Sequence, residues 1–379
     1  MKFSLVGPVY PYRGGIAHYN TQLALTLASR GHTVQVVSFK RQYPAWLYPG
    51  ESDKDPSQHP LLTPAEYLLD PLYPWTWLKT LGVIRQSLPD RVVFNWWTTF
   101  WAPAYAFLTW RLRRSGIQVL FLVHNVQPHE SRFFDRFLAR LALGQAGGFI
   151  TQTAREAERL QELFVGQGQI QRTRVQICPH PEYEMFSSQR IPQVEARRKL
   201  QLPGEGPVLL FFGIVRPYKG LEYLLEAIRR SALQGVNPYL IVAGEFWEQK
   251  QHYLEIIERL ELKDRVRLDN RYIPDEEVAD YFSAADLFVA PYVQGTQSGS
   301  AHLALGFGLP VVASLSIVDE TLMEREGSQT WLAQPGDADS LAIAIRTALQ
   351  AVQAGNIPKP QVATVGGWER LAQVIEEWE

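Results

Sequence analysis

Residues 208–220 read VLLFFGIVRPYKG and combine an apolar run with a glycine and two cations. The run predicts a buried strand that ends at Gly213, and Arg216 and Lys219 then fall near the start of the next helix. Backbone N–H groups at a helix start, the helix dipole and the cationic side chains all favour anionic oxygen. The segment therefore predicts a turn that binds a diphosphate.

A second segment of the same character spans residues 296–302, TQSGSAH. Small residues that open a helix bring free N–H groups and hydroxyls to one place. No acidic residue lies between Asp286 and Asp319, so nothing along this stretch repels an anion. The residues that we expect to contribute are Gln297, Ser298, Gly299, Ser300 and His302.

Glycines and a histidine mark the first half of the chain. Gly14 and Gly15 follow the first predicted strand, and glycine lets a backbone approach a ligand closely. His124 ends the strand QVLFLVH, and ligands of parallel sheets bind at the carboxyl ends of strands. No G-x-G-x-x-G motif is present in the chain, which argues against a dinucleotide oxidoreductase.

Strand and helix patterns alternate through both halves and predict an α/β protein with two doubly wound parallel sheets. The chain has 379 residues, more than one core usually serves, so we expect two Rossmann-like domains over 1–183 and 200–358. An amphipathic helix within 362–379 is predicted to cross back onto the first domain. Residues 41–76 lack periodicity and predict a long loop.

The segments FFGIVRPYKG, IPDEEVADYFSAADLFVAPY and TQSGSAHLALGFGLPVVAS resemble the retaining GT-B glycosyltransferases of the family-4 type. The HNVQPHE run and the paired glycines after Tyr10 also match that family. The resemblance covers nearly the whole chain. It implies a GT-B fold, in which an acceptor-side domain and a nucleotide-sugar-binding domain face an interdomain cleft.

The resemblance also implies a function. Such an enzyme moves a hexose from a nucleotide diphosphate sugar to a hydroxyl of a glycan or lipid-linked acceptor, with retention of configuration. Arg216 and Lys219 would hold the donor diphosphate, and His124 would contact the transferred sugar and the acceptor. No metal and no further cofactor is expected, because the cations and helix N-termini take the metal's place.

The resemblance assigns several further positions. Tyr272 and Ile273 fall where the family packs the nucleotide base, and Gly244 borders the same pocket together with Glu245. His129 and Glu130 form a polar pair that would meet the acceptor.

The chain departs from the family at two positions. The family often places its arginine directly after the glycine, whereas Ile214 stands there in this chain and the cation is Arg216. Many members carry two Glu residues seven positions apart in the second loop, and the later of these positions falls near Leu303 or Ala304. Gln297, His302 and backbone groups are then left to contact the ribose and the sugar.

The charge is uneven along the chain, with 19 Lys and Arg against 11 Asp and Glu in residues 1–180. Seven of the eleven Trp precede residue 111, among them Trp75, Trp77, Trp96, Trp97 and Trp101. Aromatic and basic side chains favour sugar rings and anionic bilayers, although burial in the core would explain the same tryptophans. We expect a cytoplasmic enzyme, peripheral at the inner face of a membrane, with no nucleic-acid partner.

Two alternatives remain open from the sequence. One is a nucleotide-sugar epimerase of the same fold, which would turn over the donor without an acceptor. The other is a non-catalytic sugar-nucleotide-binding protein, which the missing Glu pair favours.

Overall fold

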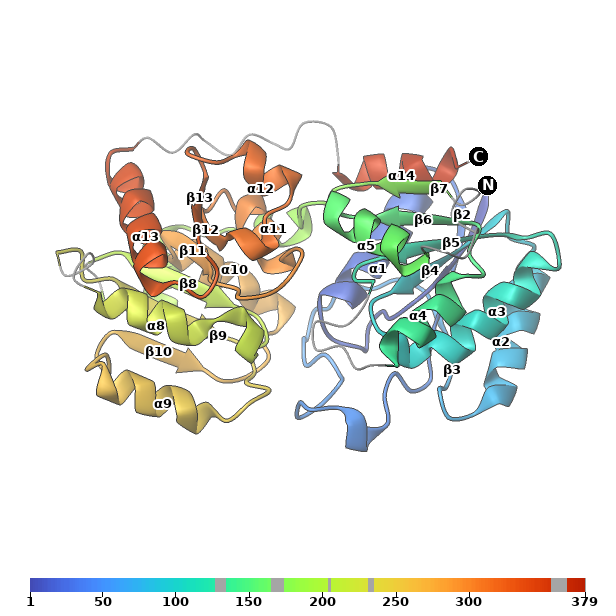
Figure 1. Cartoon of the computed structure of the whole chain (residues 1–379), viewed down its shortest axis with the longest axis horizontal. Helices are drawn as coiled ribbons and strands as arrows, with labels where there is room; N and C mark the ends of the chain where they lie inside the picture. The colour runs from blue at the N-terminus through green and yellow to red at the C-terminus, as the bar shows by residue number, and fades with distance from the viewer. Residues whose placement is uncertain (127–133, 165–173, 204–205, 231–234, 356–366, 379) are drawn as a thin grey trace. The chain divides into compact units, whose positions relative to one another are not determined.

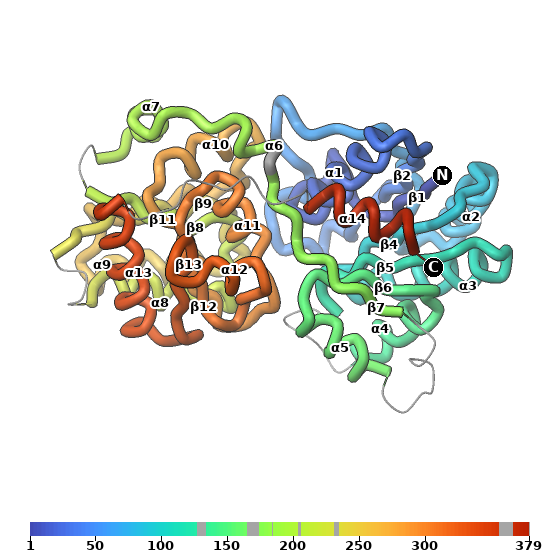
Figure 2. Tube along the Cα trace, turned by 90° about the horizontal axis from the view of Figure 1, so that it is seen from above, coloured from blue at the N-terminus to red at the C-terminus, as the bar shows by residue number. Residues whose placement is uncertain are grey.

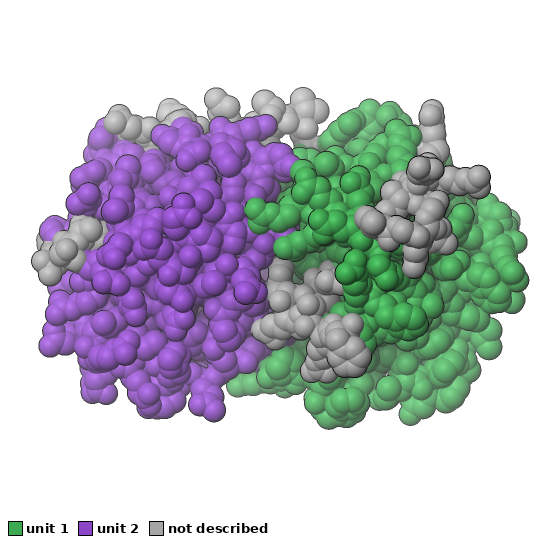
Figure 3. Space-filling view, viewed as in Figure 1, with its two compact units in different colours: residues 1–55, 61–180, 365–379 green, residues 56–60, 181–364 purple. Residues whose placement is uncertain are grey.

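The computed structural model describes residues 1–126, 134–164, 174–203, 206–230, 235–355 and 367–378. These residues form two compact units, coloured separately in Figure 3. Unit 1 comprises Met1–Asp55, Leu61–His180 and Val365–Glu379, and unit 2 comprises Pro56–Pro60 and Pro181–Thr364.

Unit 1 is built on a seven-stranded parallel sheet with the order β3-β2-β1-β4-β5-β6-β7 (Figure 1). Its strands are rich in Val, Leu, Ile and Phe because helices cover both faces of such a sheet. The strands are β1 (Lys2–Val6), β2 (Thr33–Phe39), β3 (Glu66–Leu69), β4 (Arg91–Trp96), β5 (Gln118–Val123), β6 (Gly148–Thr151) and β7 (Arg174–Ile177).

The α-helices of the described part of unit 1 are α1 (Gly15–Ser29), α2 (Pro74–Ser87), α3 (Ala102–Arg113), α4 (Asp135–Leu143), α5 (Ala154–Phe164) and α14 (Gly367–Glu376). Helix α3 packs between α2 and α4 on one face of the sheet (Figure 1). The long loop predicted over residues 41–76 is wrong at its end, because β3 and the start of α2 lie within it. Strand β3 is an edge strand whose residues Glu66 and Tyr67 are exposed, so it lacks the apolar alternation of an inner strand.

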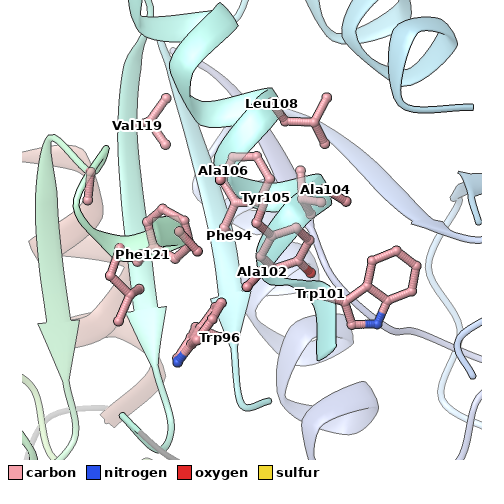
Figure 4. Packing of buried hydrophobic residues seen from close by; sticks show 14 of the residues in the cluster. Phe94, Trp96, Trp101, Ala102, Ala104, Tyr105, Ala106, Leu108, Val119 and Phe121 are labelled. Atoms are coloured by element: carbon pink, nitrogen blue, oxygen red, sulfur yellow. The ribbon is translucent and has the colours of Figure 1, made fainter. Parts of the chain in front are cut away.

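The core of unit 1 is aromatic and takes up several of the tryptophans in the first half. Trp96 and Trp101 are buried beside Phe94, Tyr105 and Phe121 (Figure 4). The Trp101 and Tyr105 rings stack with centroids 6.1 Å apart. Burial of apolar area therefore explains these tryptophans without a ligand.

The C-terminal helix α14 returns to unit 1, as predicted, and packs along α1 (Figure 2). The Arg91 guanidinium donates hydrogen bonds to the backbone carbonyls of Ile375, Glu376 and Trp378. A Cβ atom on Gly148 would lie 2.2 Å from the Trp378 ring, so this strand position requires glycine for the helix end to pack.

Unit 2 contains a six-stranded parallel sheet with the order β10-β9-β8-β11-β12-β13. Two such α/β units confirm the predicted fold class. The strands are β8 (Val208–Phe212), β9 (Tyr239–Ala243), β10 (Val266–Asp269), β11 (Leu287–Ala290), β12 (Val311–Ser314) and β13 (Thr330–Ala333).

The helices of unit 2 pack against both faces of this sheet (Figure 1). They are α6 (Glu184–Ser187), α7 (Gln193–Lys199), α8 (Leu221–Arg229), α9 (Lys250–Arg259), α10 (Asp275–Ala284), α11 (Gly299–Gly306), α12 (Glu320–Glu324) and α13 (Ala338–Gln353). Strand β8 lies between β9 and β11, so the strand order reverses beside it. Ligands of open α/β sheets bind at the carboxyl ends of strands at such a reversal.

Candidate functional site

The loop that follows β8 and the first turn of α11 meet at Gly213. The φ angle of Gly213 is +104°, a left-handed conformation that favours glycine. A Cβ atom built there would lie 3.2 Å from Ser300 Oγ and 3.3 Å from Lys219 Nζ. The structure thus brings together the two segments that the sequence predicts to bind anions, with a hydroxyl and an ammonium group both close to Gly213.

Gly244, at the end of β9, allows the neighbouring loop to approach. The Gly213 N–H donates to the Ala243 carbonyl at 2.9 Å. A Cβ atom on Gly244 would lie 2.1 Å from the Gly213 carbonyl oxygen, at a φ of +153°. The two backbones therefore pass too closely for any side chain at position 244.

We expect Gly244→Ala to lower the free energy of unfolding by roughly 3 kcal/mol, because the added methyl group forces the loop after β8 to move. Urea unfolding measures the loss. The control is Gly82→Ala in α2, where a Cβ meets no atom within 4 Å. Alanine is the better helix former there, so this control should gain up to about 1 kcal/mol. Equal stability of the Gly244 variant and the wild type would contradict the close approach.

Lys219 is a buried cation, with 9% of its surface exposed. It ends a short 3₁₀ turn, Pro217–Lys219, directly before α8. Burial lowers the pKa of Lys219, Tyr218 opposes this effect and Arg216 adds to it. No described carboxylate forms an ion pair with it, and its Nζ lies 5.3 Å from the centroid of the Tyr292 ring. The site therefore holds positive charge that an anionic ligand would neutralise.

The second loop is organised around Ser298, the N-cap of α11. Its Oγ accepts a hydrogen bond from the Ala301 N–H at 3.3 Å and donates one to the Tyr292 hydroxyl at 3.3 Å. Burial raises the pKa of Tyr292 to about 12, while hydrogen bonds to the Ser298 and Ser300 hydroxyls act in the opposite direction. Ser298 is thus used to shape the loop, whereas Gln297, Gly299 and Ser300 are partly exposed.

His302 lies deeper than its predicted role requires. It is fully buried, and its Nε2 is 2.6 Å from Asp319 Oδ2. Burial disfavours the charged imidazole, but the Asp319 carboxylate raises the pKa of His302 overall. Asp319 also caps α12 by accepting a hydrogen bond from the Leu322 N–H. His302 therefore connects α11 to α12 inside unit 2.

Tyr272 and Ile273 follow β10, the neighbour of β9, at the same edge of the sheet. The Asn270 side-chain oxygen accepts a hydrogen bond from the Phe246 N–H at 2.9 Å and so joins the two loops. Ile273 is buried and Tyr272 is partly exposed. The positions predicted to pack the base thus lie at the carboxyl edge that also carries Gly213.

In unit 1, the predicted glycines begin helix α1. Gly14 has a φ of +106° and is the N-cap residue, and Gly15 is the first residue of the helix. A Cβ on Gly14 would meet no atom within 4 Å, so the space beside it is open. The first turn of α1 carries no acidic residue. An anion could therefore approach this N-terminus without repulsion from that turn.

His124 belongs to a chain of buried hydrogen bonds at the carboxyl edge of the unit 1 sheet. Its Nε2 lies 3.1 Å from Asn95 Oδ1, Asn95 Nδ2 donates to Asn20 Oδ1 at 2.7 Å, and Asn20 Nδ2 donates to the Pro8 carbonyl at 3.2 Å. A carbonyl only accepts, so the direction of every bond in the chain is determined. His124 Nε2 therefore carries the proton.

The His124 imidazole is neutral near pH 7. Burial lowers the pKa of His124 to about 4, and a hydrogen bond with Gln152 only partly opposes this effect. The Tyr19 ring packs edge-on against the imidazole with centroids 4.8 Å apart. Ring contact and hydrogen bond together fix the orientation of the side chain.

The low pKa of His124 makes the stability of unit 1 depend on pH. Unfolded histidine titrates near 6.5, so between about pH 6.5 and pH 4 the unfolded state binds more protons than the folded state. Stability should fall by roughly 2–3 kcal/mol as the pH drops through that window. Urea unfolding at several pH values should show this loss in the wild type and a smaller one in His124→Gln. Identical pH dependence of the two proteins would contradict the buried neutral imidazole.

Two predicted positions, His129 and Glu130, lie outside the described residues. Sequence reasoning in turn missed Asn95, Asn20 and Trp247. Asn95 left a signal, since it is a polar residue near the end of the apolar strand RVVFNWW. No sequence signal points to Trp247, because nothing in the local pattern shows that it lies beside Arg216.

Comparison with known proteins identifies the family and the fold. Residues 14–176 match the family described as "Glycosyl transferase 4-like domain", and residues 206–351 match "Glycosyl transferases group 1". The chain therefore belongs to the group 1 glycosyltransferases and has the GT-B fold.

Individual relatives are distant. The chain is 26% identical over 272 residues to "GDP-mannose:glycolipid 4-beta-D-mannosyltransferase" of Xanthomonas campestris pv. campestris, which covers 71% of this chain and 70% of that protein. Sucrose-phosphate synthase from Thermosynechococcus elongatus has a similar structure, with a TM-score of 0.69, 20% identity and coverage of 99% and 98% of the two chains. Anabaena HepE in complex with UDP-glucose gives a TM-score of 0.66 at 18% identity, with coverage of 98% and 94%.

Proposed function

We propose that this glycosyltransferase moves a hexose from a nucleotide diphosphate sugar to a hydroxyl group of a glycolipid or glycan acceptor. The convergence of Gly213, Lys219 Nζ and Ser300 Oγ carries the proposal. In the transfer, the bond between the anomeric carbon and the diphosphate oxygen breaks and the acceptor oxygen bonds to that carbon. The leaving nucleoside diphosphate gains negative charge, which Lys219 and Arg216 are placed to stabilise.

The remaining loops of unit 2 supply the other donor contacts in this proposal. Gln297, Ser300 and the free N–H groups at the start of α11 bind phosphate or sugar oxygens. Tyr272 and Ile273 pack the base. The donors named for relatives support this class of ligand, since the Xanthomonas protein is named for GDP-mannose and the Anabaena structure contains UDP-glucose.

In the same proposal, His124 acts as a neutral group that orients the transferred sugar or the acceptor hydroxyl. With a pKa of about 4 it is a poor proton acceptor near neutral pH. The acceptor proton then passes to an oxygen of the leaving diphosphate.

Retention of configuration and independence from metal belong to the proposal as well. The two cations of the turn carry out the charge stabilisation that a bound metal otherwise provides. The name of the Xanthomonas relative specifies a β linkage in its own product. Whether this chain retains or inverts the configuration is therefore tested by the anomeric configuration of its product. Proton NMR of the product measures it, and transfer in excess EDTA tests the metal requirement.

The transfer assay uses radiolabelled UDP-, GDP- and ADP-hexoses with a bacterial lipid extract as the acceptor. We expect one donor to label solvent-extractable lipid, and Lys219→Ala to abolish the labelling. Turnover of the donor without acceptor and with a changed sugar would instead identify an epimerase. Donor binding without transfer to lipid or glycan acceptors would identify a non-catalytic binding protein.

We further propose that the outer face of α2, α3 and α4 contacts an anionic bilayer. Its exposed apolar side chains are Trp75, Leu78, Trp110, Phe137 and Leu141. The only charged residues of α2 and α3 are cations, and the Arg114 guanidinium lies 4.6 Å from the centroid of the Trp110 ring. Exposed aromatic groups interleaved with cations favour the surface of an anionic membrane. No described helix is long and apolar enough to cross a membrane.

Charge reversal on this face tests the membrane contact. Lys79→Glu with Arg114→Glu should weaken sedimentation with phosphatidylserine vesicles by about 10-fold or more, since each cation near the surface contributes about 1 kcal/mol. Arg229→Glu with Lys263→Glu, two exposed changes in unit 2, should leave sedimentation unchanged. Equal binding to neutral and anionic vesicles would contradict the proposal.

A further inference from the structure

The strands β8 and β9 continue to pair beyond their glycines. Val215 and Phe246 form an isolated parallel bridge. The Val215 N–H donates to the Glu245 carbonyl at 2.9 Å, and the Trp247 N–H donates to the Val215 carbonyl at 3.1 Å. Residues 214–216 and 245–247 are therefore two short extended segments that lie side by side at the carboxyl edge of the unit 2 sheet.

Alternation along these segments decides which side chains share a face. Val215 is fully buried, and Arg216 has extended backbone angles, with φ −140° and ψ 155°. Neighbouring residues of an extended chain point to opposite faces, so Ile214 and Arg216 lie on the same face. By the register of the bridge, Trp247 lies beside Arg216 on that face.

The shared face of Ile214 and Arg216 explains how Arg216 can take the place of an arginine at position 214. The resembling family often carries its arginine at the position of Ile214, directly after the glycine. The Arg216 side chain projects from the same face as position 214, about 7 Å further along the chain, because an extended residue rises about 3.3 Å. An arginine side chain is long enough to span such a distance when it is directed back toward Gly213.

Trp247 lies where it can direct Arg216. The Arg216 guanidinium lies over the Trp247 ring, 4.8 Å from its centroid. The Trp247 Nε1–H donates to Glu245 Oε2 at 2.7 Å, and Glu245 is only 5% exposed. The indole is thus fixed by a buried carboxylate and presents its face to the cation.

Arg216 also shares the electrostatic environment of Lys219, because its charge lowers the pKa of Lys219. The guanidinium therefore lies within electrostatic range of the ammonium group that borders Gly213. An arginine without a fixed neighbour loses more rotamer entropy when it binds a ligand than one already ordered by stacking.

We propose that Trp247 is a positioning residue that holds Arg216 toward the donor diphosphate and so replaces the arginine absent from position 214. This inference rests on the proposed function, since it assumes that the turn after β8 binds the diphosphate. Trp247 acts through Arg216 and has no contact of its own with the diphosphate.

Isothermal titration of the full chain with UDP, GDP and ADP tests the inference, using whichever nucleotide binds most tightly to the wild type. Arg216→Ala should weaken binding by about 10-fold or more, the usual effect of losing a charged hydrogen bond. Trp247→Leu should weaken it about 3- to 10-fold, which corresponds to a cation–π contact. Trp247→Phe should restore most of the affinity, because an aromatic face remains.

The double variant Arg216→Ala/Trp247→Leu provides the decisive comparison. If Trp247 acts through Arg216, the double variant binds no more weakly than Arg216→Ala alone. The inference would be overturned if the loss of affinity in the double variant equalled the product of the two single losses. A Trp247→Leu protein with wild-type affinity would overturn it as well. Arg229→Ala serves as the control for loss of a cation, since Arg229 pairs with Glu261 on the surface of α8.

The outcome separates the inference from the proposed function. If Lys219→Ala abolishes nucleotide binding while the Arg216 and Trp247 effects are independent, the diphosphate site stands and the positioning role is wrong. If no nucleotide binds to the wild type, the proposed function itself fails.

Discussion

Lys219→Met is expected to make the ligand-free protein more stable and at the same time to weaken its binding of nucleoside diphosphates. The Lys219 side chain is 9% exposed, and its pKa is lowered by burial. A buried charge that no described carboxylate neutralises costs free energy, and an apolar side chain of similar length avoids that cost. The melting temperature without ligand should therefore rise by about 2–4 °C for each kcal/mol gained.

The same substitution removes a cation that borders Gly213. Nucleotide affinity should fall by about 10- to 100-fold, because a hydrogen bond to a charged group is lost. Thermal unfolding with and without UDP, GDP and ADP measures both effects in one experiment. Lys263→Met, at an exposed position paired with Glu258, is the control and should change neither. A Lys219→Met protein that is still stabilised by nucleotide as strongly as the wild type would contradict the assignment.

His124→Ala is expected to lower sugar transfer by about 100-fold or more, comparable to the loss of one preorganised polar group in an active site. Donor affinity should be unchanged, since the donor loops belong to unit 2 and His124 belongs to unit 1. Transfer from the radiolabelled donor to lipid, followed at saturating donor, measures the loss. Wild-type transfer by a folded His124→Ala protein would remove His124 from the reaction.

Two further measurements distinguish this role from a structural one. Because the pKa of His124 is about 4, the wild-type rate should show no loss of activity near pH 6.5 that is attributable to this residue. Asn95→Asp would place a carboxylate 3.1 Å from Nε2 and favour the charged imidazole. Its pH–rate profile should then gain an ionisation that the wild type lacks. An unchanged profile would contradict the hydrogen-bond chain.

Much of the fold could be predicted because its signals are local. The buried parallel strands read as apolar runs, and strand–helix alternation in both halves predicts two doubly wound sheets. The turn after β8 was predictable for the same reason, since Gly213, Arg216 and Lys219 lie within seven residues.

Other features depend on distant contacts and leave little local trace. The meeting of Lys219 with Ser300, and of Arg216 with Trp247, follows from the strand order β9-β8-β11 rather than from spacing in the sequence. The contact of His302 with Asp319, seventeen positions away, leaves no local trace either. The sequence does not distinguish tryptophans of the core from tryptophans of the surface. In the structure Trp96 is buried and Trp75 is exposed.

In the proposed donor site, the missing Glu pair gives the two cations of the turn a larger role. Helix α11 contains no carboxylate, and its residues Leu303 and Ala304 are buried. Under the proposed function, donor recognition then depends on cations, hydroxyls and backbone N–H groups, all of which favour phosphate oxygen. Affinity should therefore reside mainly in the diphosphate.

The most direct test of the diphosphate site is calorimetric titration of the wild-type chain with UDP, GDP and ADP and with the corresponding monophosphates. Lys219, Arg216 and the start of α11 predict that one diphosphate binds at least about 10-fold more tightly than its monophosphate, since the second phosphate adds charged hydrogen bonds. Equal affinity for the diphosphate and the monophosphate, or no binding of any nucleotide, would contradict the site described for unit 2.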